Sequence, residues 1–373
     1  MISSLHLINF KKFEDQLLEF KPLTLISGLN STGKSSVLQS LLLLRQSSQQ
    51  NLLPNIGLAL NGELVNIGTA QDAFYESGKE NLISLEIIWE NYKSKCKCKW
   101  VFKYDPDQKD EDVLNIISEP DDSYQSNLFS NNFHFLQAER IGPRSFNEIS
   151  DYKVRRCRQI GTRGEYTAHF LYIYGREPIP IENLSYPEAK SMDLIDQVEA
   201  WMREVSPGIR IEIKANPEMG LVNIQYFYGE SNRYRATNVG FGITYTLPII
   251  VAILSSYPGT LILVENPEAH LHPRGQAKMG ELLALAASCG VQVVIETHSD
   301  HVLNGIRLAV HAGKIKPESV QLHYFKRQEK QGQGFTEVVS PRINRSGRID
   351  KWPDGFFDEW DKSLEVLLEP VEE

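Results

Sequence analysis

The sequence has few cysteines, no long apolar run and no excess of basic residues, and each shortage excludes a class of protein. Its four cysteines are scattered along 373 residues, which fits neither a disulfide framework nor a zinc ribbon. The longest apolar runs, Leu41 to Leu44 and Leu247 to Leu254, are too short to span a bilayer, and no signal-peptide pattern opens the chain. We therefore expect a cytoplasmic protein with no membrane partner.

Basic side chains are too few overall to coat a nucleic acid without sequence preference. The formal net charge is −9 at pH 7, whereas binding to phosphate backbones needs clustered lysine and arginine. One segment does gather basic residues, namely Lys153, Arg155, Arg156, Arg158 and Arg163. We call it the basic segment, and it is a candidate surface for DNA or a partner protein, or an ordinary solvated face.

Length and composition indicate a large α/β protein. A chain of 373 residues exceeds the size at which single cores usually stop growing, so one large domain with insertions, or two lobes, is expected. With 41% hydrophobic and 23% charged residues the composition is that of an ordinary globular protein, which leaves function to the motifs.

The strongest motif follows a short apolar strand predicted at Leu23 to Ser27. The next eight residues fit G-x-x-x-x-G-K-[ST], and a helical run from Ser36 to Arg45 comes directly after them. In such a loop backbone N–H groups surround phosphates, Lys34 reaches the β and γ oxygens, and the Ser35 hydroxyl binds Mg²⁺. We therefore predict a site for ATP and Mg²⁺. Its predicted members are Gly28, Asn30, Ser31, Thr32, Gly33, Lys34, Ser35 and Ser36.

A second motif is the apolar strand predicted at Leu261 to Glu265, which ends in a carboxylate. Such a strand carries a Walker B acid to the metal, so Glu265 is predicted to bind Mg²⁺. In ABC ATPases a glutamate that polarises the attacking water usually follows, but here the residue is Asn266, whose amide cannot accept a proton. Two outcomes stay open: hydrolysis is slow, or Glu268 acts as the base.

A third apolar strand, predicted at Val291 to Glu296, is followed by Thr297-His298-Ser299-Asp300. At a strand end that faces a ligand crevice, an imidazole can donate a hydrogen bond to a γ-phosphate. We predict that His298 acts as such a switch, although a single histidine is often structural. His270 and His272 fit no metalloprotease spacing, so we expect them in a loop.

A polar segment follows the strand predicted at His134 to Ala138. Strand ends of α/β folds face the ligand, so Gln137 is a candidate sensor of Mg²⁺ and water, while Arg140 is a candidate contact for phosphate or a partner. The alternative is a surface turn with ordinary salt bridges.

Two glycines lie ahead of an apolar helix predicted at Thr244 to Leu254. Asn238, Gly240 and Gly242 belong to this turn, whose bare amides can bind a phosphate held by an opposing subunit. The alternative is a turn that only caps the helix.

Residues 61–235, which lie between the P-loop and the second group of motifs, are predicted to form insertions in the ATPase core. Period-two patterns predict antiparallel strands at Ile83 to Trp89 and Cys96 to Tyr104, joined by a polar connection, and an acidic loop at 105–132. We predict the following organisation: 1–60, first half of the ATPase core; 61–132, β arm and acidic loop; 133–235, helical and strand lobe with the basic segment; 236–340, second half of the core; 341–373, C-terminal tail.

Together these motifs resemble the OLD/RecF/SMC-like branch of ABC ATPases. The resemblance is carried by LHLINFKKF at 5–13, by the P-loop, by ENPEAHLHP from Glu265 and by ETHSDH from Glu296. The tail at 344–358, with WPDGFFD, resembles the end of an uncharacterised subfamily of that branch. The implied fold is a P-loop NTPase of the ABC/SMC head type, in which helices flank a mixed central sheet that carries an antiparallel β arm and a helical insertion.

The resemblance also implies roles for single residues. It makes Asn238 to Gly242 a signature loop that acts on the nucleotide of a second subunit, Glu265 the Walker B acid and His298 the switch. Lys11 and Lys12 are expected near the adenine or the phosphates. The chain departs from the branch at Asn266 and in having no long coiled coil or TOPRIM nuclease module.

The leading hypothesis is an ATPase in which ATP closes a head-to-tail homodimer. This dimer is expected to gate DNA or a separate effector, such as a nuclease or toxin, as such ATPases do in bacterial phage defence. The first alternative is a scaffold that is locked by nucleotide and scarcely hydrolyses it. The second is a role in DNA repair or recombination, and a transporter ATPase has no support from the motifs.

Overall fold

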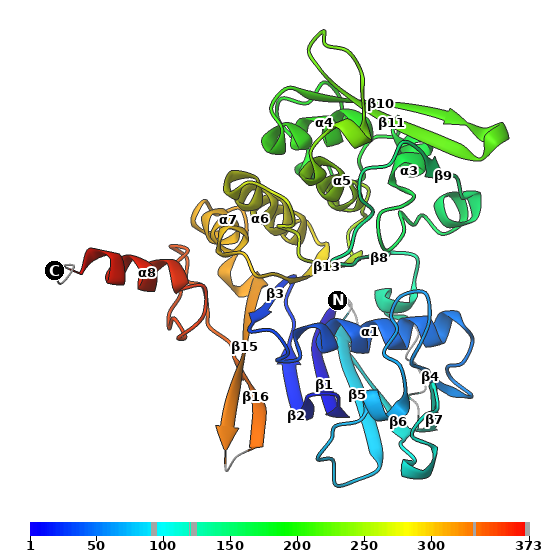
Figure 1. The fold of residues 1–373 in the computed structure, drawn as a ribbon, viewed down its shortest axis with the longest axis vertical. Coiled ribbons are helices and arrows are strands. Elements are labelled where there is room, and N and C mark those ends of the chain that lie inside the picture. Colours follow the sequence, from blue (N-terminus) through cyan, green and yellow to red (C-terminus); the bar gives the residue numbers. More distant parts are fainter. Residues whose placement is uncertain (91–94, 119, 121–124, 331–332, 370–373) are drawn as a thin grey trace.

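The computed structural model describes residues 1–90, 95–118, 120, 125–330 and 333–369. It arranges them in three sheets with helices between and around them (Figure 1). Residues 91–94 of the predicted polar connection lie outside the described residues. No helix within the described ranges is long and apolar enough to cross a membrane.

Six strands form the middle sheet. They are β3 (Leu23–Gly28), β8 (Phe133–Leu136), β13 (Leu261–Glu265), β14 (Gln292–Glu296), β15 (Val320–Lys330) and β16 (Gln333–Val339). Their order is β16-β15-β3-β14-β13-β8, and all neighbours are parallel except β16 with β15. Because parallel strands end at one edge, the residues after β3, β14, β13 and β8 meet there.

Helices cover both faces of the middle sheet. The α-helices within the described residues are α1 (Lys34–Gln49), α2 (Ala70–Ala73), α3 (Thr167–Tyr174), α4 (Leu194–Val205), α5 (Phe241–Leu254), α6 (Pro273–Ser288), α7 (Asp300–His311) and α8 (Glu359–Leu368), of which α1, α5, α6 and α7 cover the middle sheet. In Figure 1, α1 lies on one face of the sheet, and α5, α6 and α7 lie on the other.

Alternate residues of each middle strand face these two layers. Ile262 and Val264 join the core of α5, α6 and α7, whereas Leu261 and Leu263 join the core of α1. The period of two places Glu265 on the α1 face with Leu263. By the same alternation Glu296 follows Val294 onto the α1 face, since Val294 belongs to the core of α1.

A second sheet packs against α1 from the other side. Its strands are β1 (Ile2–Phe10), β2 (Phe13–Glu19), β4 (Gly57–Ala59), β5 (Leu82–Glu90), β6 (Lys95–Lys103) and β7 (Val113–Ser118). The order is β2-β1-β5-β6-β7-β4. The predicted β arm, β5 and β6, is therefore continuous with the N-terminal hairpin, because β5 pairs with β1.

The predicted acidic loop at 105–132 is not wholly a loop. Strand β7 lies within it and pairs with β6 and β4. The reason is its short apolar piece, in which Leu114 is buried in the core that α1 shares with the second sheet. Acidic residues flank this strand without preventing it.

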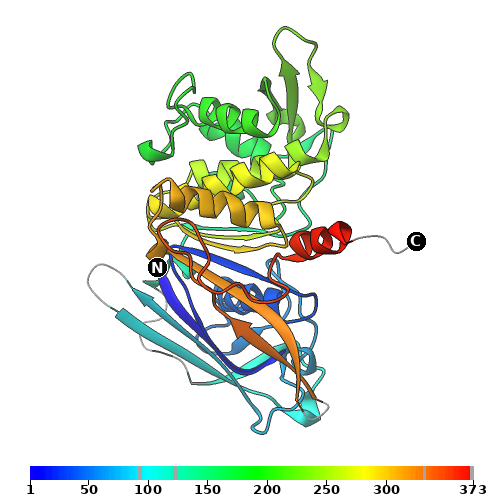
Figure 2. The same cartoon turned by 90° about the vertical axis from the view of Figure 1, so that its left-hand side faces the viewer.

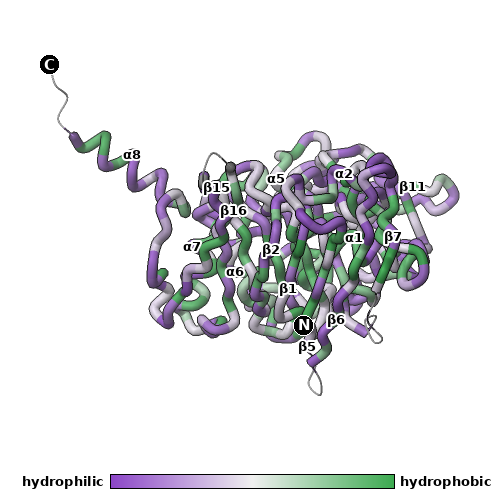
Figure 3. Tube along the Cα trace, turned by 90° about the horizontal axis from the view of Figure 1, so that it is seen from below, coloured by the Kyte–Doolittle hydropathy of each residue, from purple (hydrophilic) through white to green (hydrophobic). Residues whose placement is uncertain are grey.

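A third, small sheet lies at the far end of the molecule. It contains β9 (Asn147–Glu148), β10 (Ile209–Asn216), β11 (Leu221–Tyr228) and β12 (Tyr234–Arg235). Figure 2 shows it with α3 and α4 on the opposite side of the middle sheet from the second sheet. Helix α8 projects from the body with apolar and polar residues mixed along it, and none of its side chains is buried (Figure 3).

Candidate nucleotide-binding site

The predicted P-loop connects β3 to α1 with the backbone that the motif requires. Gly28 and Gly33 have φ of 143° and 95°, and Ser31 also has a positive φ of 64°. A Cβ on Gly28 would lie 2.1 Å from the carbonyl oxygen of Phe325, so only glycine fits there. No side chain caps the N-terminus of α1, so the N–H groups of Lys34 and Ser35 stay available for an anion.

Lys34 and Ser35 open α1 toward the strand ends. Lys34 is 4% exposed, and its Nζ donates to the carbonyl of Leu29 at 2.7 Å. Burial lowers the pKa of Lys34, which Glu296 partly opposes. The Ser35 hydroxyl donates to Oε1 of Glu296 at 3.1 Å. Thr32 and Ser36 are also buried, whereas Asn30 and Ser31 are exposed at the tip of the loop.

Glu265 ends β13 beside Glu296 at the end of β14. The two residues pair in register, so their side chains point to the same face of the sheet. The backbone N–H of Ala138 donates to Oε2 of Glu265 at 2.9 Å, and burial raises the pKa of Glu265. A carboxylate thus stands where the Walker B strand was predicted to place it.

Glu296 is a site residue that the motif analysis did not single out. It is 7% exposed, and its Oε2 has no hydrogen-bond partner within the described residues. Burial, followed by the charge of Glu265, raises the pKa of Glu296 to about 7. Its signal in the sequence was its place as the last residue of an apolar strand, the same signal that singled out Glu265.

Arg140 does not lie on the surface, in contrast to both interpretations of its segment. It is 1% exposed, and Nη1 donates to the carbonyls of Gln137 at 3.1 Å and Glu265 at 2.7 Å. Nη2 donates to the carbonyl of Asn266 at 2.6 Å. Burial lowers the pKa of Arg140 to about 10, and Glu268 is the largest opposing influence. Arg140 therefore holds the turn that follows Glu265.

Asn266 occupies a strained position in this turn. Its φ is 46°, a left-handed conformation that asparagine tolerates better than most residues. Its backbone N–H donates to the carbonyl of Glu296 at 2.8 Å, which ties the two strand ends together.

Glu268 links the Walker B turn to the predicted switch. Its Oε2 accepts from the Thr297 hydroxyl at 2.7 Å, and its Oε1 accepts from the backbone N–H of His298 at 2.8 Å. Both carboxylate oxygens are therefore engaged in holding the loop that carries His298. The His298 side chain is exposed at the sheet edge, and partial burial, then Lys34, lowers its pKa. His272 caps α6 and His270 precedes it, so both lie in a loop as predicted.

Gln137 directly follows β8, next to β13 in the sheet. Its backbone N–H donates to the carbonyl of Thr162 at 2.9 Å. Its side chain makes no hydrogen bond to any described residue, which leaves the amide available at this edge. The structure thus brings the Gln137, Glu265 and Ser35 segments to the edge where Mg²⁺ was predicted.

The predicted signature loop lies at the start of α5. Gly240 caps α5, and a Cβ on Gly242 would lie 2.5 Å from the carbonyl oxygen of His270. Asn238 ends a short 3₁₀ turn before it. Within the described ranges, no hydrogen bond joins 238–242 to 28–36. Phe241 is 54% exposed, so this loop presents an apolar side chain to solvent.

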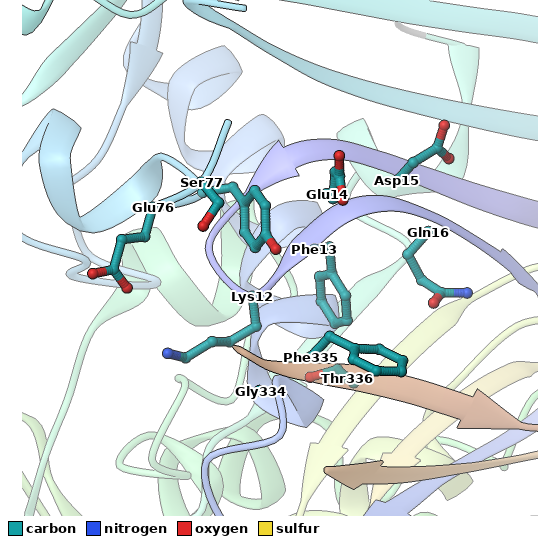
Figure 4. A pocket seen from close by; sticks show the side chains of 11 residues that line it. Lys12, Phe13, Glu14, Asp15, Gln16, Glu76, Ser77, Gly334, Phe335 and Thr336 are labelled. Carbon is teal, nitrogen blue, oxygen red and sulfur yellow. The ribbon is translucent and has the colours of Figure 1, made fainter. Parts of the chain in front are cut away.

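A cavity of about 620 Å³ lies beside the P-loop. Lys12 and Phe13 of the first hairpin line it together with Phe335 and Thr336 of β16, as Figure 4 shows. The P-loop is its neighbour, because a Cβ on Gly33 would lie 2.8 Å from the Phe13 ring. Residues 14–16, 75–77 and Gly334 complete the lining. The cavity has room and aromatic surface for a nucleobase.

The two lysines of the first hairpin have different places. Lys12 lines the cavity beside the P-loop. Lys11 donates from Nζ to Gln39 of α1 at 3.0 Å and lines a neighbouring hollow with Asp72. Burial lowers the pKa of Lys11, and Asp72 opposes this. Lys12 thus borders both hollows, whereas Lys11 borders only the second one.

The basic segment carries much less free charge than its sequence indicates. Lys153 pairs with Glu63 at 2.5 Å and Arg155 with Asp151 at 2.9 Å. The remaining pairs are Arg163 with Glu139 at 3.0 Å and Arg158 with Glu177 at 3.8 Å. These acids come from other parts of the chain or from just before the segment, so a phosphate backbone would have to compete with them.

The strand order and the loop between β3 and α1 define a P-loop NTPase fold of the SMC head type. The chain belongs to the family described as "AAA domain, putative AbiEii toxin, Type IV TA system", whose model matches residues 23–304. A second model, "Protein of unknown function (DUF3696)", matches residues 315–367, which include β15, β16 and most of α8. No curated protein matches the chain.

Solved structures of SMC heads share the fold. One is the SMC head bound to the C-winged helix domain of ScpA, with 13% identity and a TM-score of 0.52 over 91% of this chain and 98% of that chain. Another is the head domain with an extended coiled coil bound to the C-terminal domain of ScpA derived from Pyrococcus furiosus, with 11% identity and a TM-score of 0.50 over 99% of both chains. The predicted fold class is thus confirmed.

Proposed function

We propose that this protein binds ATP with Mg²⁺ at the P-loop and hydrolyses it slowly. The observation that carries the proposal is the meeting of β3, β14 and β13 at one edge, where Ser35, Glu296 and Glu265 gather beside the open N-terminus of α1. Mg²⁺, held by Ser35 and Glu265, would neutralise charge on the β and γ phosphate oxygens. The buried Oε2 of Glu296, which has no partner, fits a cation at this place.

The chain's own groups then act by position and charge. Lys34 already lies at the P-loop, where its ammonium donates to the Leu29 carbonyl. When ATP binds, the ammonium would donate to phosphate oxygens in place of that carbonyl. Glu268 holds the backbone of His298 so that the imidazole stays at the sheet edge that faces the γ-phosphate position. No covalent intermediate with the protein is needed.

Slow turnover follows from the residues around the attacking water. Asn266 cannot accept a proton, and both oxygens of Glu268 already accept hydrogen bonds. This favours a second candidate function, a nucleotide-locked scaffold whose ATP-bound state, and not its turnover, carries the signal.

We also propose that two copies close head to tail over two nucleotides. Support comes from the signature loop, which makes no hydrogen bond to its own P-loop among the described residues and which exposes Phe241. A second copy would bring Asn238, Gly240 and Gly242 to the γ-phosphate. The amides at the start of α5 suit that role.

A partner protein is the third part of the proposal. The SMC heads of similar fold were solved with domains of ScpA bound, and the matching family description names a toxin of a toxin–antitoxin system. Both support an ATP-gated complex with a separate effector, such as a nuclease or toxin in phage defence. DNA has less support as a partner, because residues of the basic segment already form ion pairs within the chain.

The deciding experiment measures phosphate release and oligomeric state together. Purified protein is incubated with Mg²⁺ and ATP, and Lys34→Ala is compared with Lys326→Ala, whose lysine pairs with Glu337 outside the site. We expect slow turnover and ATP-induced dimers in the wild type and in Lys326→Ala, and neither in Lys34→Ala. Dimers without turnover would favour the scaffold, and an absence of nucleotide binding would refute both functions.

A further inference from the structure

Glu296 occupies the centre of the strand ends. Its strand, β14, lies between β3, which leads into the P-loop, and β13, which carries Glu265. The alternation of each strand points Glu265 and Glu296 toward α1, where Ser35 lies. Two carboxylates and a hydroxyl from three separate elements therefore face one point.

The carboxylate of Glu296 is only half satisfied. Oε1 accepts a 3.1 Å hydrogen bond from the Ser35 hydroxyl. Oε2 is buried without a hydrogen-bond partner in the part of the chain that the structure describes, and the whole residue is 7% exposed. The Lys34 ammonium donates its hydrogen bond to the Leu29 carbonyl and makes none to Glu296 among the described residues. An unsatisfied buried carboxylate next to another carboxylate costs free energy unless a cation joins them.

A divalent cation satisfies this arrangement. Mg²⁺ prefers oxygen ligands and usually takes one or two carboxylates, with phosphate oxygens and water completing its shell. The hydrogen bond from Ser35 shows that Glu296 already reaches the hydroxyl predicted to bind the metal. A ligand that lies within reach of Ser35 and beside Glu265 needs no rearrangement of the backbone to join the same metal.

We propose that Glu296 is a second carboxylate ligand of the metal at this site, together with Glu265 and Ser35. The proposal rests on the nucleotide function above and adds one ligand and one negative charge to it. With two carboxylates the site holds a divalent cation before the nucleotide arrives. In the absence of metal, Glu296 instead holds the Ser35 hydroxyl in place.

The test uses Mn²⁺ as a spectroscopic probe. Electron paramagnetic resonance titration of nucleotide-free full-length protein gives the Mn²⁺ affinity directly, without any turnover. We expect Glu296→Gln and Glu265→Gln each to weaken Mn²⁺ binding at least tenfold. Glu86→Gln is the matched control, because Glu86 is a buried strand carboxylate that pairs with Lys97 in the second sheet. It is expected to bind Mn²⁺ as the wild type does.

A second titration separates this proposal from the nucleotide function. Binding of a fluorescent ATP analogue is followed while Mg²⁺ is varied, and again in EDTA. We expect Glu296→Gln to need at least tenfold more Mg²⁺ for half-maximal binding and to match or exceed wild-type affinity in EDTA, because it removes a negative charge. Wild-type Mg²⁺ dependence in Glu296→Gln, with loss in Glu265→Gln, would overturn the assignment of Glu296.

Folding of the variants is controlled independently. Circular dichroism checks each variant, and Glu296→Asp keeps the charge on a side chain shorter by one methylene group. If Glu296→Gln does not fold, Glu296→Asp is expected to show weakened Mn²⁺ binding with intact secondary structure, and wild-type affinity there would refute the proposal. If the protein binds Mn²⁺ but no nucleotide, the proposed function fails while the metal site stands.

Discussion

The hydroxyl of Thr336 donates a 2.9 Å hydrogen bond to the carbonyl of Thr32, so the C-terminal hairpin is tied to the P-loop. The partners are 304 residues apart in the sequence. Through this contact β16 places Phe335 at the cavity that Phe13 lines from the first hairpin (Figure 4). A segment beyond the AAA match thereby completes the cavity beside the P-loop.

Removal of the Phe335 ring is expected to weaken binding of the base. Phe335 is 42% exposed beside the P-loop, and stacking of a base on an aromatic ring contributes about 1–3 kcal/mol. We expect Phe335→Ala to lower ATP affinity about tenfold and to leave tripolyphosphate affinity unchanged, as measured by calorimetry. Tyr234→Ala, at a similarly exposed ring on the third sheet, is the control. Equal losses for both ligands would place the base elsewhere.

Introduction of a carboxylate at position 266 is expected to accelerate hydrolysis. Asn266→Glu supplies the missing proton acceptor, although a left-handed conformation costs a longer side chain about 1 kcal/mol. We expect kcat to rise at least tenfold in a phosphate-release assay. Asn266→Gln is the control, because glutamine meets the same left-handed backbone conformation but has no carboxylate. Its hydrolysis rate should stay as low as that of the wild type. A rate in Asn266→Glu that equals the wild-type rate would mean that another group already serves as the base.

Arg140 is expected to be one of the most destabilising positions to change. Arg140→Met leaves the carbonyls of Gln137, Glu265 and Asn266 without their buried donor, which should cost about 3–5 kcal/mol. Arg163→Met removes an exposed pair and should cost less than about 1 kcal/mol. Urea unfolding measures both. Similar urea midpoints for the two variants would show that the turn after Glu265 is stable without the Arg140 hydrogen bonds.

Glu296 is expected to reduce the stability of the nucleotide-free protein as pH rises. Burial and Glu265 raise its pKa from 4.5 to about 7 in the folded state. The native state then holds the proton more tightly than the unfolded chain. The free energy of unfolding therefore decreases as the pH rises from 4.5 to about 7, and it stays lower above about pH 7. The full effect is about 3 kcal/mol.

The neutral variant reveals this cost. Glu296→Gln should unfold at higher urea concentration than the wild type at pH 8 and at nearly the same concentration at pH 4.5, in metal-free buffer. Glu86→Gln, whose carboxylate pairs with Lys97, should give no such gain at pH 8. A wild type that is as stable as Glu296→Gln at both pH values would contradict the raised pKa.

The basic segment is expected to contribute little to DNA binding. Its ion pairs with Glu63, Asp151 and Glu139 already satisfy most of its charge. We expect Lys153→Glu with Arg156→Glu to leave the weak affinity for duplex DNA, and its slope with salt, unchanged in fluorescence anisotropy. Tight wild-type binding that this double variant abolishes would restore a DNA function.

Motifs whose function depends on adjacent residues could be predicted from the sequence. The P-loop is such a motif, since local glycines between a strand and a helix set its conformation. The two apolar strands that end in Glu265 and Glu296 could be predicted for the same reason. The strand β7 was missed because acidic residues surround its few apolar positions. Arg140 was misplaced, since charge alone predicts a surface position and nothing in its neighbourhood predicts burial.

The sequence by itself determined the phosphate loop and the apolar strands that lead to the site, because hydrophobic period and glycine position act over a few residues. Only the tertiary structure decided which strand ends adjoin. The sheet order β3-β14-β13-β8 brings Ser35 to Glu296 across 261 residues and Arg140 to Glu265 across 125. Such contacts follow from the packing of two cores against one sheet, which no local pattern encodes.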